Sequence, residues 1–126
     1  MEKMNILIIA AHGSRKKASN DELAILAGRL KTRLSDRFDR VAHAFLQLAE
    51  PLLEDTLNEM AAKGDVRVVV FPFFIGAGSH IKEDIPRLVE DARHRYPDAD
   101  IVLTRHLGAL EAIDGIIAGE ALKTVD

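Results

Sequence analysis

Two histidines, His12 and His80, are the residues of this sequence best suited to chemistry, because each follows an apolar segment at a turn that contains glycine. His12 is succeeded by Gly13, which allows a sharp backbone turn, and His80 stands behind Gly76 and Gly78. Two neutral imidazoles suit cobalt, nickel, iron, copper or zinc, and so few protein ligands leave coordination positions open for a substrate. The alternative is a pair of unrelated loop histidines, and the residues alone leave both interpretations open.

The other three histidines are weaker candidates for the same site. His94 lies between two arginines in a helical pattern and is expected to be solvated. His43 is expected to be a structural or edge residue of a strand. His106 ends a strand-like segment, and we expect it to be either a distant member of the site or a cap. The sequence contains no cysteine, so any metal must be bound through nitrogen or oxygen.

Basic side chains accompany both histidines. In a chain with a formal net charge of −3, such a cluster would attract an anionic ligand to one region of the surface. A basic loop that is simply solvated explains the same residues equally well. The cluster consists of Arg15, Lys16 and Lys17 after the first histidine, and of Lys82 and Arg87 after the second.

Four apolar segments, residues 4–10, 41–48, 66–74 and 101–103, predict β-strands. The first segment is apolar almost throughout, which is typical of a strand buried on both faces of a parallel sheet. The third is rich in valine and phenylalanine, and Pro72 should mark its end because proline lacks the amide hydrogen that strand pairing needs.

Helical periodicity fills the intervals between these strands. Ser19 and Glu22 have the spacing of a capping box, and Pro51 suits the first position of a second helix. Strict alternation of strand and helix predicts a single domain over residues 1–126 with an α/β fold. We expect a flavodoxin-like, parallel-sheet three-layer sandwich in which about four strands alternate with four helices. The helices are expected over residues 19–34, 51–63, 84–96 and 110–121.

In parallel α/β folds the ligand binds beyond the carboxyl ends of the strands, where loops and helix N-termini converge. This rule selects the loops at residues 12–18, 47–50 and 76–84, and it brings the two histidines to one edge of the sheet. The further loop residues predicted to face a ligand are Gln47, Gly78 and Ser79.

Several ligand classes are excluded by spacing and composition. Segment 76–81 begins like a dinucleotide-binding fingerprint but carries Ile81 where the third glycine belongs. A P-loop is excluded as well, because no glycine of the sequence is followed by lysine and then by serine or threonine. Ser14 lacks the flanking glycines of a nucleophile elbow. The aromatic content of 5% and the negative charge argue against nucleic acid. No apolar run approaches the ~20 residues of a membrane span, so we expect a cytoplasmic protein.

Three segments together resemble the short form of the sirohydrochlorin chelatases, the class II chelatases that need no ATP. They are AHGSR at residues 11–15, FLQLAEP at 45–51 and FPFFIGAGSHIKEDIP at 71–86. Each segment alone is weak, but their combination and order are specific, and the resemblance covers nearly the whole chain.

The resemblance implies insertion of cobalt, or of iron or nickel, into sirohydrochlorin for cobalamin or siroheme synthesis, with the metal as a substrate and no organic cofactor. It assigns catalysis and metal binding to His12 and His80. It also implies a homodimer, because longer members contain two similar lobes. Sirohydrochlorin is rich in carboxylates, which the basic cluster could bind, and its apolar face could rest on Phe73, Phe74 and Ile75. The expected substrate-binding residues are Arg15, Lys16, Lys17, Gln47, Gly78, Ser79 and Lys82.

One position departs from the pattern of the family. Many similar chains carry glutamate where this sequence has Gln47, and an amide neither accepts a proton near neutral pH nor equals a carboxylate as a metal ligand. Either the histidines suffice, or Glu50 substitutes, or activity is reduced. One rival interpretation is therefore a non-catalytic tetrapyrrole- or metal-binding protein of the same fold. Another is a flavodoxin-like module for phosphate or flavin, which predicts an aspartate after the first strand that this chain lacks.

Overall fold

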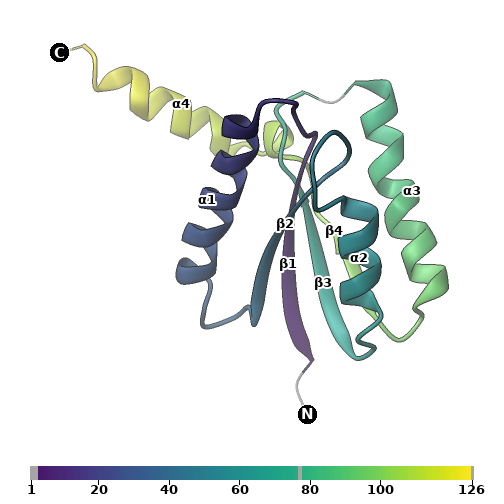
Figure 1. The fold of residues 1–126 in the computed structure, drawn as a ribbon. Helices are drawn as coiled ribbons and strands as arrows, with labels where there is room; N and C mark the ends of the chain where they lie inside the picture. The colour runs from purple at the N-terminus through teal and green to yellow at the C-terminus, as the bar shows by residue number, and fades with distance from the viewer. Residues whose placement is uncertain (1–2, 77, 126) are drawn as a thin grey trace.

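The computed structural model describes residues 3–76 and 78–125, with residues 79–81 described by their backbone alone. Four parallel strands form one sheet in the order β2-β1-β3-β4 (Figure 1). The strands are β1 (Met4–Ala11), β2 (Arg40–Phe45), β3 (Val66–Pro72) and β4 (Asp100–Leu103). The parallel sheet predicted from the apolar segments is therefore confirmed.

Helices follow the strands in strict alternation. They are α1 (Lys17–Arg33), α2 (Leu53–Ala61), α3 (Ser79–Arg95) and α4 (Ala112–Leu122), with a short 3-10 turn, η1 (Leu107–Ala109), before the last. α1 lies on one face of the sheet, and α2 and α3 lie on the other, which makes the three layers of the predicted sandwich (Figure 1). No described helix is both long enough and apolar enough to cross a membrane.

The central strand β1 is buried on both faces, as its continuous apolar sequence predicts. Ile6 and Ile8 are fully buried in the larger core under α2 and α3. Leu7 and Ile9 point to the opposite face and form a smaller core with α1. The two cores fix the register of β1 between its neighbours, because a slip of one residue would exchange the two faces.

The beginning of α1 differs from the prediction. The helix starts at Lys17, and its N-cap residue Lys16 makes no side-chain capping hydrogen bond, so the predicted capping box of Ser19 and Glu22 is wrong. The reason is that the chain before the helix is held by another residue, Asn20, through its side chain.

The second strand is shorter than predicted, and the helix after it begins later. β2 ends at Phe45, and the next residues form a turn in which Leu48 has a φ of 67°, a left-handed conformation that ends extended structure. α2 begins at Leu53, so Pro51 belongs to the turn and is not the first helical residue.

The third helix begins five residues before its predicted start. A helix from residue 84 would leave Pro86 in its first turn, where the missing amide hydrogen costs nothing. α3 instead begins at Ser79 and carries Pro86 in its interior. His80, expected at the end of a loop, consequently lies in the first turn of α3.

Candidate functional site

The candidate site lies at the carboxyl edge of the sheet, around the loop that follows β1. The helix after β1 covers one face of the sheet and the helix after β3 covers the other, although these strands are neighbours. The two connections therefore diverge and leave a crevice at this edge, the position at which parallel α/β folds bind ligands.

The loops after β1 and β2 are joined by backbone hydrogen bonds beyond the ends of the strands. The Leu46 amide donates to the Ala11 carbonyl at 2.9 Å, and the Gln47 amide donates to the His12 carbonyl at 3.2 Å. Gly13 permits this approach, because its φ is 100° and a Cβ at this position would overlap the Gln47 carbonyl oxygen. Glycine at residue 13 thus sets the distance between the two loops.

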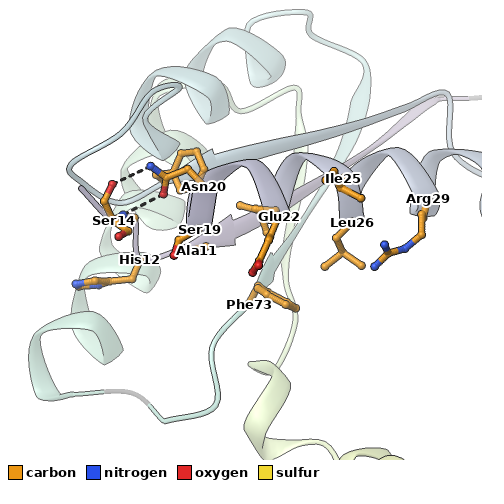
Figure 2. Close-up of a pocket in the computed structure, with 13 residues that line it drawn as sticks. Ala11, His12, Ser14, Ser19, Asn20, Glu22, Ile25, Leu26, Arg29 and Phe73 are labelled. Atoms are coloured by element: carbon orange, nitrogen blue, oxygen red, sulfur yellow. Dashed lines mark hydrogen bonds between the residues drawn. The ribbon is translucent and has the colours of Figure 1, made fainter. Parts of the chain in front are cut away.

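Asn20 holds the loop that carries His12, a role that we did not predict from the sequence. Its side-chain oxygen accepts from the Ser14 amide at 3.1 Å, and its side-chain nitrogen donates to the Ser14 carbonyl at 2.8 Å (Figure 2). The Ser14 hydroxyl in turn accepts from the Lys16 amide at 3.0 Å. The only signal in the sequence is an asparagine six residues after a loop serine. This spacing predicts the hydrogen bonds only when the conformation of the loop is already known.

His12 and Gln47 meet at this edge. The Nε2 atom of His12 and the Nε2 atom of Gln47 are 3.1 Å apart, and both side chains are exposed. When the imidazole carries its proton on Nδ1, the amide donates to the lone pair on Nε2. A metal ion at Nε2 would need that lone pair, so Gln47 must turn its amide away, or present its oxygen, when His12 binds a metal.

A groove of about 660 Å³ runs from the His12 loop along α1. Figure 2 shows Glu22 and Arg29 along one side of this helix, His12 in the loop before it, and Phe73 facing that side. The volume lies within the usual range for sites that bind small organic ligands, roughly 300 to 1,000 Å³. Its lining is mainly apolar and includes Ala11, Leu23, Ile25, Leu26, Phe45 and Phe73.

The second predicted histidine is only partly described. The backbone of His80 lies in the first turn of α3, and Gly78 is the N-cap residue of that helix. The side chains of Ser79 and His80 lie outside the described residues. The structure therefore places the backbones of the two histidines after neighbouring strands, β1 and β3, and leaves their shared site as a hypothesis.

The predicted basic cluster is divided by the structure. Arg15 and Lys16 are exposed in the loop beside His12. Lys17 forms an ion pair with Asp21 at 3.0 Å on its own helix, which partly offsets its charge toward a ligand. Lys82 is also exposed and lines a second cavity, of about 170 Å³, on the α3 side of the crevice. Arg87 likewise pairs within its helix.

The three apolar residues after β3 point to different places. Phe73 lines the groove beside His12, as the predicted apolar wall requires. Phe74 packs against the core of the opposite face, and its ring stacks on His106 with centroids 5.7 Å apart. Ile75 is exposed. Only Phe73 therefore shares the groove with His12.

The remaining candidates lie outside the groove. Glu50, the possible substitute for a family glutamate, lines a separate shallow pocket with Asp55 and Glu59. His43 is half-buried on the edge strand β2, and His94 is exposed on α3 beside Glu90, as predicted. Among the described side chains, which do not include those of residues 79–81, no three histidines or carboxylates gather as a metal-binding group.

Fold and site together define a class: a parallel α/β protein with a histidine and a ligand-sized groove at the carboxyl edge of its sheet. Comparison with protein families is more specific. The model of the CbiX family matches residues 6–122, so the chain belongs to the CbiX family.

Individual relatives agree with this family. A chloroplastic sirohydrochlorin ferrochelatase of Arabidopsis thaliana is 35% identical over 102 residues, which cover 81% of this chain and 44% of that protein. A sirohydrochlorin cobaltochelatase of Methanococcus aeolicus is 29% identical over 86 residues, covering 68% of this chain and 59% of that protein. The chain thus spans about half the length of these curated relatives.

A solved structure supports the same fold. The sirohydrochlorin chelatase SirB of Bacillus subtilis subspecies spizizenii, in complex with cobalt, superposes with a TM-score of 0.77 at 24% identity. The match covers 94% of this chain and 50% of the SirB chain. The chain therefore shares its fold with half of the SirB chain.

Proposed function

We propose that the chain is an enzyme that inserts a divalent metal ion into sirohydrochlorin, in cobalamin or siroheme synthesis, with cobalt as the first candidate and iron or nickel as alternatives. The observation that carries this proposal is that His12, in contact with Gln47, lines a ligand-sized groove. Family membership and the chelatase names of the relatives support it.

In this proposal the metal is a substrate that His12 and His80 hold on one face of the macrocycle. Imidazole nitrogen suits all three metals, and two protein ligands leave coordination positions for the pyrrole nitrogens. Insertion displaces two pyrrole protons, and each histidine can accept one of them as general base once the metal has left its lone pair for the ring nitrogens. The exposed position of His12 supports this role, because the released protons have a direct path to water.

The groove supplies a surface for the rest of the ring. Phe73 and the apolar residues of α1 offer a wall for a flat macrocycle. The exposed cations Arg15 and Lys16 directly follow Ser14, which lines the groove. Each exposed ion pair with a substrate carboxylate contributes at most about 1 kcal/mol, so these contacts orient the ring more than they hold it. Lys82 is proposed to act in the same way from the other side of the crevice.

The direct test is to mix the purified protein with sirohydrochlorin and each of Co²⁺, Ni²⁺ and Fe²⁺, and to follow the absorption change of metal insertion. We expect insertion with at least one metal at a rate well above that of the protein-free mixture. Binding of sirohydrochlorin without faster insertion of any metal would instead support a non-catalytic tetrapyrrole-binding protein.

Gln47→Glu is expected to tighten Co²⁺ binding about tenfold and to preserve or raise the insertion rate. The amide nitrogen of Gln47 lies 3.1 Å from Nε2 of His12 and competes with a metal ion for the lone pair on that atom. The carboxylate of the variant has no hydrogen to donate to this lone pair and can itself bind the metal. A tenfold gain in affinity corresponds to about 1.4 kcal/mol, and an anionic oxygen is a stronger ligand for a divalent metal than a neutral amide. Calorimetric titration with Co²⁺ and the insertion assay measure the two effects.

The matched control is Glu50→Gln, which changes a carboxylate of the same turn outside the groove. It should alter neither metal affinity nor rate. The gain from Gln47→Glu should fade as the pH falls toward the ordinary pKa of a glutamate, about 4.3. If Gln47→Glu leaves both quantities unchanged, the turn after β2 does not reach the metal; if Glu50→Gln inactivates the protein, Glu50 has the acid's role.

The proposal also includes a homodimer as the active form. It is supported by large apolar side chains that the described chain leaves exposed, among them Val102 on β4 at 37% and Ile116 and Ile117 on α4 at 62% and 63%. Oligomers of identical chains most often adopt two-fold symmetry. A monomeric mass in light scattering at micromolar concentration, with full activity, would contradict this part of the proposal.

A further inference from the structure

Leu48, in the turn after β2, is held in a conformation that leucine disfavours. Its φ is 67°, and among the described residues it is the only one besides glycine with a positive φ. In this left-handed conformation the Cβ atom lies too close to the following carbonyl oxygen, so turns that need it usually carry glycine or asparagine. A leucine at this position therefore makes the turn less stable than glycine or asparagine would.

Contacts on both sides of Leu48 hold this conformation in place. Before it, the Gln47 amide donates to the His12 carbonyl at 3.2 Å. After it, the Pro51 carbonyl accepts a hydrogen bond from the Phe45 amide at 2.8 Å, which returns the chain to the end of β2. Because residue 48 lies between these two contacts, its backbone is fixed by the loop of β1 on one side and by β2 on the other.

The strain at Leu48 is not compensated by packing within the chain. Two other apolar residues of the turn are half-buried, Leu46 against the core under α2 and α3 and Ala49 against the core under α1. Leu48 belongs to neither core and is 52% exposed. Backbone outliers of this kind cluster at ligand-binding sites, where a contact outside the fold offsets their cost.

The position of Leu48 indicates which ligand it meets. It directly follows Gln47, whose amide nitrogen lies 3.1 Å from Nε2 of His12. Since β1 lies between β2 and β3, the turn after β2 and the loop after β3 begin on opposite sides of the strand that carries His12 (Figure 1). Their starting points are roughly 10 Å apart, twice the spacing of neighbouring strands. The loop after β3 carries a second exposed apolar side chain, Ile75, at 64%.

We propose that Leu48 contacts the macrocycle of the substrate and, together with Ile75, holds the ring over His12. The face of a tetrapyrrole is apolar, whereas its carboxylates lie at the rim. A ring placed over His12, with one edge in the groove along α1, meets an apolar side chain on either side. The fixed backbone presents Leu48 before the ring arrives, so little conformational freedom is lost on binding. The inference rests on the proposed function and assigns Leu48 to the ring, not to the metal.

A loss of affinity without a loss of stability is the expected signature of this contact. Leu48→Gly removes the disfavoured conformation, and the greater freedom of glycine in the unfolded chain offsets part of that gain. Its melting temperature should therefore stay the same or rise by a few degrees. We expect metal-free sirohydrochlorin to bind about tenfold more weakly, the effect of losing roughly half of a leucine's burial against the ring. Absorption titration and thermal unfolding measure the two quantities.

Three further variants separate the side chain from the backbone. Leu48→Met keeps an apolar side chain and the disfavoured conformation, so it should bind the ring nearly as tightly as the native chain. Leu48→Asn suits the left-handed conformation but presents a polar group, so it should be as stable as Leu48→Gly and bind as weakly. Met4→Ala shortens another exposed apolar side chain, at the opposite end of β1, and should leave ring affinity unchanged.

Two further measurements exclude other roles of residue 48. A leucine side chain has no atom that binds a metal, so the Co²⁺ affinity of Leu48→Gly in the absence of the ring should equal that of the native chain. A parallel loss of Co²⁺ affinity would mean that residue 48 acts by positioning Gln47, and it would overturn the proposed contact. A native dimer that dissociates in Leu48→Gly, measured by light scattering, would also overturn it, because the leucine would then belong to an interface between copies.

Failure of the inference and failure of the proposed function give different results. If the native chain does not bind sirohydrochlorin, both are wrong. If it binds the ring without inserting a metal, the enzymatic function is wrong, and the affinities of the variants still decide the contact with Leu48. If Leu48→Gly binds the ring as tightly as the native chain does, the inference alone is wrong. Weaker ring binding in both Leu48→Gly and Leu48→Asn, at unchanged Co²⁺ affinity and undiminished melting temperature, would confirm it.

Discussion

His12→Ala is expected to lower the rate of metal insertion about 100-fold or more, with little change in stability. A general base alone contributes roughly 10²- to 10⁴-fold, and in the proposed mechanism His12 is both a metal ligand and a candidate base. Its ring is exposed and its described polar contact is with Gln47, so removing it opens no cavity. Surface substitutions of this kind usually change stability by less than about 0.5 kcal/mol.

The measurement compares insertion rate, Co²⁺ affinity and thermal unfolding for His12→Ala, His80→Ala and the double variant. If both histidines hold one metal, the double variant should lose little more than either single variant, because groups that act as a unit are not additive. His94→Ala, an exposed histidine on α3, is the matched control and should keep full activity. Unchanged metal binding and insertion in a folded double variant would refute the assignment.

Periodicity and composition were sufficient to predict the fold. β1 is apolar at nearly every position, and only a strand with helices on both sides of its sheet can bury such a sequence. The ends of helices and strands were predicted less accurately, because tertiary contacts can outweigh local sequence signals. The Ser19–Glu22 spacing predicted a helix start that Asn20 overrides. Helical periodicity predicted that α3 begins at residue 84, whereas it begins at Ser79 and contains Pro86 in its interior.

The positions of site residues could be predicted where they follow from the order of strands and loops. They could not be predicted where they depend on contacts between side chains. A residue directly after a buried parallel strand must lie at the carboxyl edge, which placed His12 and the Gln47 turn together, now seen at 3.1 Å. The pairing of Lys17 with Asp21 and the divergence of Phe73 from Phe74 depend on side-chain directions that the sequence does not reveal.

The packing of α4 shows a second limit of prediction from the sequence. Its apolar stripe correctly predicted a helix, and the same stripe predicts burial. Which surface buries it cannot be read from one chain's sequence, because a helix that packs on its own sheet and one that packs on a second copy need the same residues. The turn before α4 is held by a hydrogen bond from the Gly108 amide to the Phe74 carbonyl, and a Cβ at Gly108 would overlap the Ile75 carbonyl oxygen; the sequence shows only a glycine there.

Gly13→Ala is expected to damage both stability and activity. A non-glycine residue with a positive φ costs roughly 1 to 2 kcal/mol, and forcing an extra methyl group into a closely packed place costs roughly 1 to 3 kcal/mol more. Here the methyl group would overlap the Gln47 carbonyl oxygen, so the backbone itself must move. The free energy of unfolding should fall by about 2 to 5 kcal/mol, and the melting temperature by roughly 10 to 20 °C.

The same displacement should move the proposed site residues His12 and Gln47 apart. His12 precedes Gly13, and its carbonyl accepts a hydrogen bond from Gln47, so moving the two loops apart shifts the imidazole relative to the groove. A misplacement of about 1 Å can cost roughly 100-fold in rate, and we expect a loss of that order in protein that is still folded. Insertion assays below the melting temperature, with the folded fraction measured by circular dichroism, separate this loss from unfolding.

Two further substitutions identify the cause. Gly28→Ala adds a methyl group to an exposed, open position within α1 and should be neutral or stabilise by up to about 1 kcal/mol, with unchanged activity. Gly13→Asn relieves much of the penalty for positive φ, because asparagine tolerates that conformation, but it retains the Cβ that meets the Gln47 carbonyl. Gly13→Asn should therefore remain nearly as inactive as Gly13→Ala. Recovery of activity in Gly13→Asn would show that backbone conformation, and not the close approach of the two loops, makes glycine necessary beside His12.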